Sequence, residues 1–368
     1  MSKFFSMIYH HLPESWKRRV RLHSKAYNDI KGGSKSTFKS RINRELKVFL
    51  NEEEQTDKLL VESIKKDIKQ CWLKYGTSPE EYFLFGYRDL DDKGRSAFIS
   101  DYEKDMTLKS KMGLDIFAKE LRDKYYFYCL TTPFFHRRAI KVAASTPETD
   151  FIAFAIEARD IFIKPDNQSR GRGAHKATIN NVEDAKKEYC DMRDKGGEWM
   201  VEELIVQSEA TKQWNPSSVN TVRIPTFLNQ KGFFVGVPFF RTGRAGACVD
   251  NAGGGGIFAN VDALTGVLYT DGIDEEGHFY EKHPDSGFVF KGFQLPRWDE
   301  LLLTVEKVHK ECMPHHLYIG WDFALTDNGW VLIEGNWGQF VSQYADHIGF
   351  KECFMKYMNA GVYSCNKM

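Results

Sequence analysis

Three side chains with oxygen donors stand at close spacing in the last part of the chain: Asp322, Glu334 and Asn336. Apolar residues flank the Asp-Asn-Gly sequence at residues 327–329, which is typical of a tight turn between two antiparallel strands. Strand side chains two apart share a face, so we expect Glu334 and Asn336 together, with Asp322 opposite them across the ladder. Two carboxylates and an amide oxygen suit Mg²⁺ whose shell is completed by phosphate oxygens. Taken alone, the segment could also be a surface hairpin with polar ends.

A second segment, around Lys164, is suited to binding phosphate. A short apolar run at residues 161–163 leads to Lys164, and the loop that follows contains Ser169, Gly171 and Gly173. Small loop residues can direct backbone N–H groups at phosphate oxygens, and lysine adds a compact positive charge. The spacing is neither that of a P-loop nor that of a dinucleotide-binding turn. A strand that runs into a plain surface loop is the competing interpretation, but together with the hairpin the segment favours a nucleotide and magnesium.

Further segments join these two in a fixed order. They are residues 80–86, 98–101 and 123–128, Lys164 with its loop, residues 201–207 and 220–223, Asp250 with residues 251 and 253–256, residues 283–285, and Asp322 with residues 334–336. In this order they resemble the ATP-grasp enzymes, and more closely the sugar-transfer-associated ATP-grasp family found among polysaccharide biosynthesis proteins. Each motif is weak alone, whereas the order is specific.

The resemblance implies an α+β protein with the ATP-grasp fold, in which nucleotide lies between two α+β lobes with mainly antiparallel sheets. The expected division is a helical N-terminal region with a basic first segment at residues 1–110, a linker and first lobe at 111–205, and a second lobe with the metal-binding hairpin at 206–368. ATP and Mg²⁺, with two ions expected, are the implied cofactors. ATP-grasp ligases commonly begin with a Rossmann-like substrate domain, whereas the first third of this chain shows a helical pattern.

The resemblance also assigns the nucleotide site. Lys164 corresponds to the family lysine on the α- and β-phosphates, and Lys124 to the earlier lysine that approaches the same phosphates, with Lys111 as a fallback. The strand whose backbone would meet the adenine edge is formed by Glu202, Glu203 and Leu204. The alternatives are a solvated lysine and strand carboxylates that are ion-paired or face solvent.

Arg223, Asn220 and Arg241 are the candidate catalytic residues. Arg223 offers the planar donor fork that suits a carboxylate or a transferring phosphoryl group, although a structural salt bridge would use the same geometry. Arg241 precedes Asp250 and the four glycines at residues 253–256, where backbone could approach an anionic intermediate. A flexible hairpin loop is the alternative for that region.

The expected reaction is amide formation. A substrate carboxylate would attack the γ-phosphorus of ATP, and an amine would displace phosphate from the acyl phosphate through a tetrahedral oxyanion. We therefore expect an ATP-dependent carboxylate–amine ligase in cell-surface polysaccharide biosynthesis or modification, acting on a small-molecule or glycan-linked carboxylate. The alternatives are a kinase or phosphotransferase acting on a hydroxyl, and a nucleotide-binding accessory protein of a glycan assembly complex.

Composition restricts the location and the partners. No apolar run of membrane-spanning length occurs, and the N-terminus lacks a secretory signal pattern. Seven scattered cysteines without a CxxC or Cys/His cluster indicate reduced thiols in the cytoplasm and argue against structural zinc. Lys and Arg equal Asp and Glu overall, but residues 1–50 hold twelve Lys or Arg against three Asp or Glu. This basic segment could bind an anionic surface at the inner membrane face, bind a glycan, or pack on the protein itself. No motif predicts nucleic-acid binding.

Residue patterns predict the main elements. Pro79, after Thr77 and Ser78, is expected to open a helix. Other helices are predicted at residues 114–128, 181–194 and 298–313, and strands at 161–164, 199–206, 221–228, 233–241 and 267–270, with the hairpin at 317–333.

Overall fold

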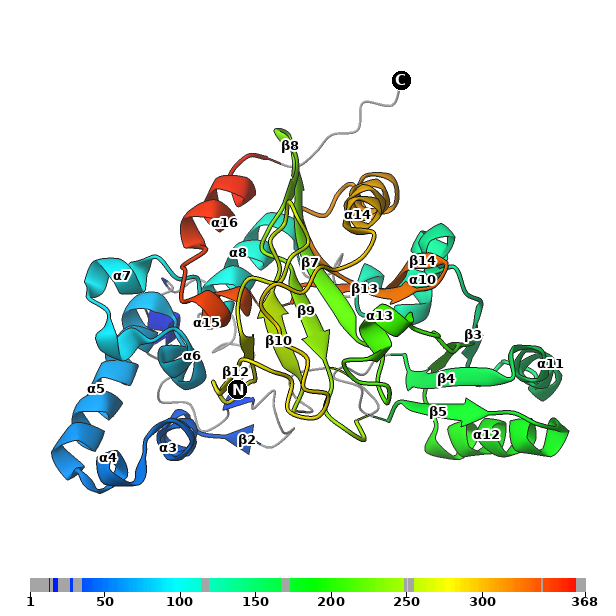
Figure 1. The fold of residues 1–368 in the computed structure, drawn as a ribbon, viewed down its shortest axis with the longest axis horizontal. Coiled ribbons are helices and arrows are strands. Elements are labelled where there is room, and N and C mark those ends of the chain that lie inside the picture. Colours follow the sequence, from blue (N-terminus) through cyan, green and yellow to red (C-terminus); the bar gives the residue numbers. More distant parts are fainter. Residues whose placement is uncertain are drawn as a thin grey trace. The chain divides into compact units, whose positions relative to one another are not determined.

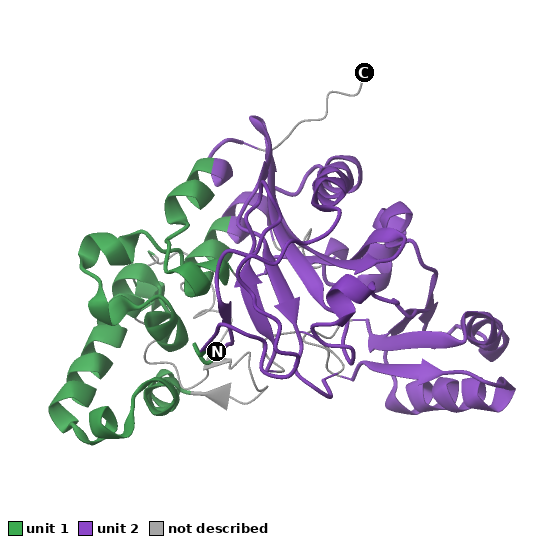
Figure 2. Ribbon diagram, viewed as in Figure 1, with its two compact units in different colours: residues 1–107, 276–278, 339–356 green, residues 108–275, 279–338, 357–368 purple. Residues whose placement is uncertain are grey.

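The computed structural model describes residues 13, 16–18, 27–28, 35–113, 119–166, 173–247, 250, 255–338 and 340–361. The chain forms two compact units, shown in green and purple in Figure 2. The first comprises residues 1–107, 276–278 and 339–356, and the second comprises residues 108–275, 279–338 and 357–368.

The first unit is mainly helical, as predicted for the N-terminal region. Its elements are α3 (Phe38–Phe49), α4 (Glu52–Thr56), α5 (Lys58–Tyr75), α6 (Pro79–Leu84), η1 (Tyr87–Asp89), α7 (Asp92–Ser96), α15 (Ser342–Asp346), and the parts within its limits of α8 (Asp101–Met112) and α16 (Lys351–Met358). Ser78 and Glu81 form a reciprocal capping box at the start of α6, and Pro79 lies in its first turn, where no N–H is needed. The helix start predicted at Pro79 is confirmed. A short antiparallel pair, β1 (Tyr27–Asn28) with β2 (Lys35–Ser36), interrupts the predicted helical region.

The smaller sheet of the second unit has the strand order β3-β6-β4-β5, all antiparallel. Its strands are β3 (Ala139–Val142), β4 (Asp160–Pro165), β5 (His175–Thr178) and β6 (Trp199–Glu203), and its helices are α11 (Glu148–Ala158) and α12 (Val182–Lys195). Figure 1 shows both helices beside β4 and β5, and they share one apolar core with the sheet.

Alternation along the strands decides which face of this sheet is free for polar side chains. Ile161, Ile163 and Val201 belong to the core shared with α11 and α12. Lys164 and Glu202 each follow a core residue by one position, so they project from the opposite face. This face carries the charged residues of the nucleotide site predicted from the sequence.

The larger sheet has eight strands in the order β12-β11-β10-β9-β7-β13-β14, with β8 also paired to β7. Its strands are β7 (Thr221–Asn229), β8 (Gly232–Val235), β9 (Phe239–Thr242), β10 (Ile257–Asn260), β11 (Gly272–Ile273), β12 (Phe279–Tyr280), β13 (Tyr318–Thr326) and β14 (Gly329–Asn336). The other helices of this unit are α10 (Lys124–Phe135), α13 (Glu209–Lys212) and α14 (Trp298–Cys312). Helices beside antiparallel sheets confirm the predicted α+β class.

The predicted hairpin forms, with Thr326 paired to Gly329 across the turn. One face of its first strand is covered by helices, since Trp321 lies against Phe127 of α10 and His309 of α14. Gly335 allows α10 to approach closely, because a Cβ there would lie 2.8 Å from the ring of Phe127. Asp322 therefore projects from the other face of the sheet.

Three predicted elements differ from the structure. The strand expected at 233–241 is divided into β8 and β9, because the two pair with β7 in registers that differ by one residue, and neither Pro225 of β7 nor Pro238 has an N–H for the ladder. Residues 267–270 form only isolated bridges. The helix expected at 114–128 is interrupted: residues 119–120 are helical, residues 121–123 are not, and α10 begins at Lys124, where the Asp123 side chain caps it; residues 114–118 lie outside the described part. Among the described helices, none combines the length and the apolar character needed to cross a bilayer.

Candidate functional site

The hairpin brings the three predicted metal ligands onto one face. Asp322 lies opposite Glu334 in the register, and Asn336 lies opposite Gly320, two residues before Asp322. A bulge between Asp322 and Phe323 shifts the register directly beyond the Asp322–Glu334 pair. The predicted pairing is confirmed, while metal binding by these residues stays a prediction.

Their donor atoms suit a cation with oxygen ligands. Asn336 Oδ1 is buried and has no hydrogen-bond partner among the described residues, which is uncommon in a protein interior. The Glu334 side chain keeps 40% of its surface exposed, so it can receive a ligand from solvent. Two carboxylates and an unpartnered amide oxygen therefore fit Mg²⁺.

Arg223 holds Asp322 from the neighbouring strand β7. Its Nε donates to Asp322 Oδ1 at 2.6 Å and its Nη2 donates to Oδ2 at 2.5 Å, while Arg241 Nη1 donates to the same Oδ2 at 3.1 Å. Burial opposes ionisation of Asp322, but the two guanidinium groups outweigh it and hold the pKa of Asp322 below its ordinary value. The carboxylate therefore carries its charge at neutral pH.

Glu334 is affected in the opposite direction. The Glu334 side chain is 40% exposed, but loss of water around the rest of it, and then the negative charge of Asp322, raise the pKa of Glu334, while the positive charges of Arg223, Lys164 and Lys124 oppose the rise. These three cations lie on different elements: Arg223 on β7, Lys164 on β4 and Lys124 at the start of α10. The two sheets of the second unit therefore direct charged groups at one place.

Lys164 lies in a buried charged triad. Its Nζ contacts Glu202 Oε1 at 2.6 Å, and the other oxygen of Glu202 accepts from Arg137 Nη2 at 2.6 Å and from its Nε at 3.0 Å. Arg137 Nη1 also donates to Leu332 O at 2.7 Å, which ties β6 to β14. Glu202 is therefore an ion-paired strand carboxylate, and its side chain positions Lys164.

The backbone of the predicted adenine-binding strand is already paired in part. The N–H of Glu203 donates to Arg138 O and the N–H of Leu204 donates to Asp160 O, both at 3.0 Å. The Glu203 side chain pairs with Arg138 at 2.7 Å. An adenine edge would therefore meet the chain where the strand ends, after Leu204.

Lys124, at the start of α10, is positioned by Asp166. Its Nζ donates to Asp166 O at 2.9 Å, and the N–H of Tyr125 donates to Asp166 Oδ1 at 3.0 Å. Burial lowers the pKa of Lys124, and Glu334 and Lys164 act on it in opposite directions. The charge pattern thus associates Lys124 with the group around Glu334, while the fallback Lys111 belongs to α8.

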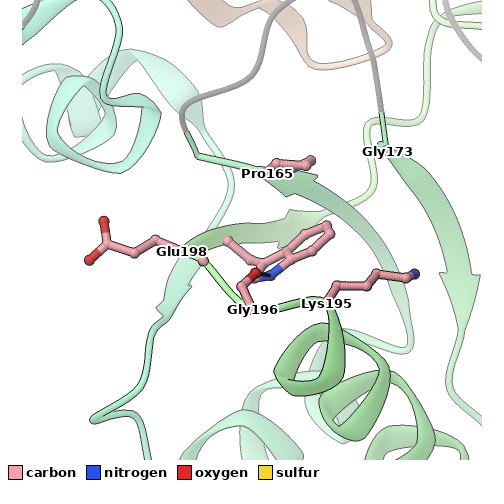
Figure 3. Close-up of a pocket in the computed structure, with 7 residues that line it drawn as sticks. Pro165, Gly173, Lys195, Gly196 and Glu198 are labelled. Carbon is pink, nitrogen blue, oxygen red and sulfur yellow. Dashed lines mark hydrogen bonds between the residues drawn. The ribbon is translucent and has the colours of Figure 1, made fainter.

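The loop after Lys164 is described only at its end. Ser169 and Gly171 lie outside the described residues. Gly173 has a left-handed φ of 72° and borders an open hollow of about 390 Å³, which Figure 3 shows between Pro165 on one side and Lys195 on the other. The remaining lining residues are Gly196, Gly197, Glu198 and Trp199. None of the predicted site residues except Gly173 lines this hollow, so its volume carries no argument for the nucleotide.

Arg241 extends the row of charges beyond Asp322. Its Nη2 donates to Asp250 Oδ1 at 2.6 Å, and the hydroxyl of Thr221 donates to the other oxygen of Asp250. Thr221 lies opposite Arg241 in the register of β7 and β9. Arg241 is thus held between two buried carboxylates, with Asp250 as a residue that positions it.

The Asn220 side chain is hydrogen-bonded to the segment that precedes β7. Its amide nitrogen donates to Gln207 Oε1, Thr211 O and Asn215 O, each at 2.9 Å. These bonds fix the segment before β7, which carries Arg223. A catalytic role for Asn220 stays a prediction, and its contacts favour a positioning role.

Comparison with known proteins decides the family. A family model described as sugar-transfer associated ATP-grasp matches residues 150–352, which is more than half of the chain. The chain belongs to this family. The resemblance seen in the sequence and the expected ATP-grasp fold are thereby confirmed.

A comparison with solved structures gives several matches. They include D-alanyl-alanine synthetase A from Vibrio cholerae O1 biovar eltor (12% identity, TM-score 0.41, covering 66% of this chain and 65% of that one) and D-alanine–D-alanine ligase from Bacillus anthracis (10%, 0.38, 66% and 67%). Another is the ATP-grasp ligase PsnB in complex with a phosphomimetic variant of its minimal precursor, Mg and ADP (12%, 0.38, 64% and 58%). The chain thus spans 58–67% of the length of these proteins. A comparison with curated proteins gives no match.

Three contributors to this ATP-grasp site were missed from the sequence. Arg137 and Asp166 hold Lys164 and Lys124 through partners far away in the chain, so no local pattern marks them. Gly338 leaves room for the site, since a Cβ there would lie 2.6 Å from both Arg223 Nη1 and Asn336 Oδ1. The only sequence signal for Gly338 is its place two residues after the Glu-Gly-Asn motif.

Proposed function

We propose that this ATP-grasp protein is an ATP-dependent carboxylate–amine ligase that forms an amide through an acyl phosphate. The observation that carries the proposal is the row Arg241, Asp322, Arg223 and Glu334 on one face of the sheet, with charge from Lys164 acting on it. Each cation of this row contacts an anion, since Arg241 and Arg223 both donate to Asp322 and Arg223 lies 3.9 Å from Glu334. Such an arrangement can hold a polyanion together with its counter-ions without leaving any charge unpaired.

Lys124 and Lys164 would bind the phosphates of ATP. Each is held by an oxygen of the protein, Asp166 O for Lys124 and Glu202 Oε1 for Lys164, so little side-chain freedom is lost when phosphate arrives. Residues after Leu204 would meet the adenine edge. Ser169, Gly171 and Gly173 are proposed to cover the phosphates through their backbone.

Asp322, Glu334 and Asn336 would hold magnesium, and two ions are proposed. When bound, Mg²⁺ neutralises charge on the β- and γ-phosphates during transfer. The raised pKa of Glu334 supports this assignment, because a proton and a metal ion relieve the same repulsion between two carboxylates.

Arg223 and Arg241 would serve the carboxylate substrate. Each already donates to a carboxylate oxygen of Asp322, which shows that their N–H groups have the geometry to bind such a group. As the amine attacks the acyl phosphate, the carbonyl oxygen gains negative charge, which these guanidinium groups would stabilise. The amine then loses a proton and phosphate departs, leaving ADP, phosphate and the amide.

The biological setting is part of the proposal. The description of the family associates it with sugar transfer, which supports a role in cell-surface polysaccharide biosynthesis or modification. A small-molecule or glycan-linked carboxylate and an amine would be the co-substrates. We propose a cytoplasmic location, with the basic residues 1–25 docking on an anionic membrane face or glycan. These residues lie almost wholly outside the described part of the chain.

Trapping with hydroxylamine tests the reaction class. Purified protein is given ATP, Mg²⁺, hydroxylamine and a panel of uronic, amino and hydroxy acids. A ligase forms a hydroxamate in step with ADP, because hydroxylamine intercepts the acyl phosphate. ADP accompanied by an alkali-stable phosphoester would instead identify a kinase. If the protein binds nucleotide but turns over neither the acids of the panel nor glycan-linked carboxylates, the accessory role is favoured.

A further inference from the structure

A second group of side chains that could bind a metal ion shares no residue with the proposed nucleotide site. Glu120, just before α10, accepts two hydrogen bonds at one oxygen, Oε2, from His315 Nε2 at 2.6 Å and from His316 Nε2 at 2.8 Å. The two histidines form the turn between α14 and β13. Ligand atoms of all three residues lie within 4.8 Å of one another.

The three side chains differ in how much of their surface is exposed to solvent. His316 is fully buried, Glu120 keeps 16% of its side chain exposed, and His315 keeps 43%. Nε2 of His316 faces Glu120 and is the nitrogen that an ion in this group would meet, while Nδ1 is buried without a partner among the described residues. One side of the group is thus fixed by the fold, while the other is open to water.

Small movements would convert the hydrogen bonds into metal bonds. Imidazole nitrogen and carboxylate oxygen bind zinc at about 2.0–2.2 Å, so tetrahedral ligand atoms are about 3.3 Å apart. The present separations of 2.6 and 2.8 Å would have to grow by less than about 1 Å. The exposed ring of His315 can turn by this amount. The ion would take the place of the two protons on Nε2, and each ring would then carry its proton on Nδ1.

We propose that Glu120, His315 and His316 form a binding site for a divalent transition-metal ion such as Zn²⁺, with water from the open side completing the shell. Two imidazoles and one carboxylate suit such an ion and disfavour Mg²⁺, which prefers oxygen ligands alone. The site is separate from the proposed magnesium ligands. The backbone oxygen of His316 accepts from His309 Nε2 at 2.8 Å, and His309 in turn bonds Thr226 of β7, so a bound ion would brace the sheet that carries Asp322.

The test uses the untagged full-length chain and Co²⁺ as a spectroscopic stand-in for Zn²⁺. We expect one equivalent of Co²⁺ to give ligand-field absorption bands of a low-coordinate site, to be displaced by Zn²⁺, and to be unaffected by millimolar Mg²⁺. His315→Ala and Glu120→Gln should each weaken the affinity by at least about tenfold. Both side chains reach solvent, and circular dichroism of the metal-free variants shows whether they fold.

The matched control changes the other adjacent histidine pair of the chain, His10 and His11, to alanine. Unchanged Co²⁺ binding in this double variant is expected. Loss of binding there, retention of full affinity in folded His315→Ala and Glu120→Gln, or no absorption band in the wild type would overturn the proposal. None of these results depends on ATP turnover, so the proposed ligase function is tested separately.

Discussion

Replacing Arg223 with lysine keeps a positive charge beside Asp322 but removes the planar fork. In the structure, Nε and Nη2 of Arg223 each donate to a different oxygen of Asp322, at 2.6 and 2.5 Å, and only 15% and 3% of the two side chains are exposed. A lysine ammonium can take one of these two positions, so one charge-assisted hydrogen bond is lost. Such a bond contributes about 1.5–3 kcal/mol.

Arg241 also donates to Asp322, at 3.1 Å, so the carboxylate remains partly compensated. We therefore expect the lower part of the range, a decrease of about 1.5–2 kcal/mol in the free energy of unfolding. If the same fork orients the reacting carboxylate, this loss corresponds to a decrease of about 10- to 30-fold in kcat/KM. Urea unfolding measures the first quantity, and hydroxamate formation measures the second.

A matched control is Arg297→Lys. Arg297 Nε donates to Glu300 at 2.7 Å, but both side chains are 42% exposed, and such surface pairs contribute less than about 1 kcal/mol. The control should therefore lose little stability and no activity. Equal losses of stability in the two variants, or hydroxamate formation at the wild-type rate by Arg223→Lys, would refute the reasoning.

Three further predictions follow from the same part of the chain. The pKa of Glu334 is raised in the folded state, so its ionised form costs stability once the pH exceeds that pKa. Glu334→Gln should therefore raise the thermal midpoint of unfolding at pH 8 without ligands, and it should abolish the further rise that Mg²⁺ and a non-hydrolysable ATP analogue cause in the wild type. A ligand-induced rise equal to that of the wild type would contradict this prediction. Lys164→Ala should lower the affinity for that analogue, measured by calorimetry, by about tenfold or more. The control Lys186→Ala, which removes an exposed lysine of α12, should leave the affinity unchanged. Equal affinities in the two variants would show that Lys164 does not bind phosphate. Gly335→Ala, whose Cβ would lie 2.8 Å from an aromatic ring of α10, should lower the unfolding free energy by about 1–3 kcal/mol. Gly320→Ala, with 3.4 Å to its nearest atom, is the control, and an equal loss in both would exclude overpacking as the cause.

Local features of the structure could be predicted from the sequence because the residues that cause them are neighbours in the chain. The hairpin around residues 327–329 needs only a turn sequence between two apolar runs, and it places Glu334 opposite Asp322. The start of α6 at Pro79 depends on the cap residue beside it. The family, too, could be inferred, because its motifs keep their order along the chain.

Short elements and breaks within strands could not be predicted in the same way. β3, with four residues, is too short for a periodic pattern, and it forms because β6 offers it a partner. The break between β8 and β9 depends on how both pair with β7, whose Pro225 has no N–H to return the bond that Gly236 donates to it. Contacts across a sheet decide these boundaries.

The chain order of the residues gives the candidate ligands, but tertiary contacts decide which charges compensate them. Glu202 could be recognised as a strand carboxylate, yet its partner Arg137 is 65 residues away, and Lys124 is held by Asp166, 42 residues away. The carboxylate of Glu120 meets His315 across 195 residues. Spacing in a sequence predicts contacts only within a helix or hairpin, because beyond a few residues the separation in space depends on how the sheets and helices pack. The pKa values of Asp322 and Glu334 differ for the same reason, since two arginines from other strands reach the first carboxylate much more closely than the second.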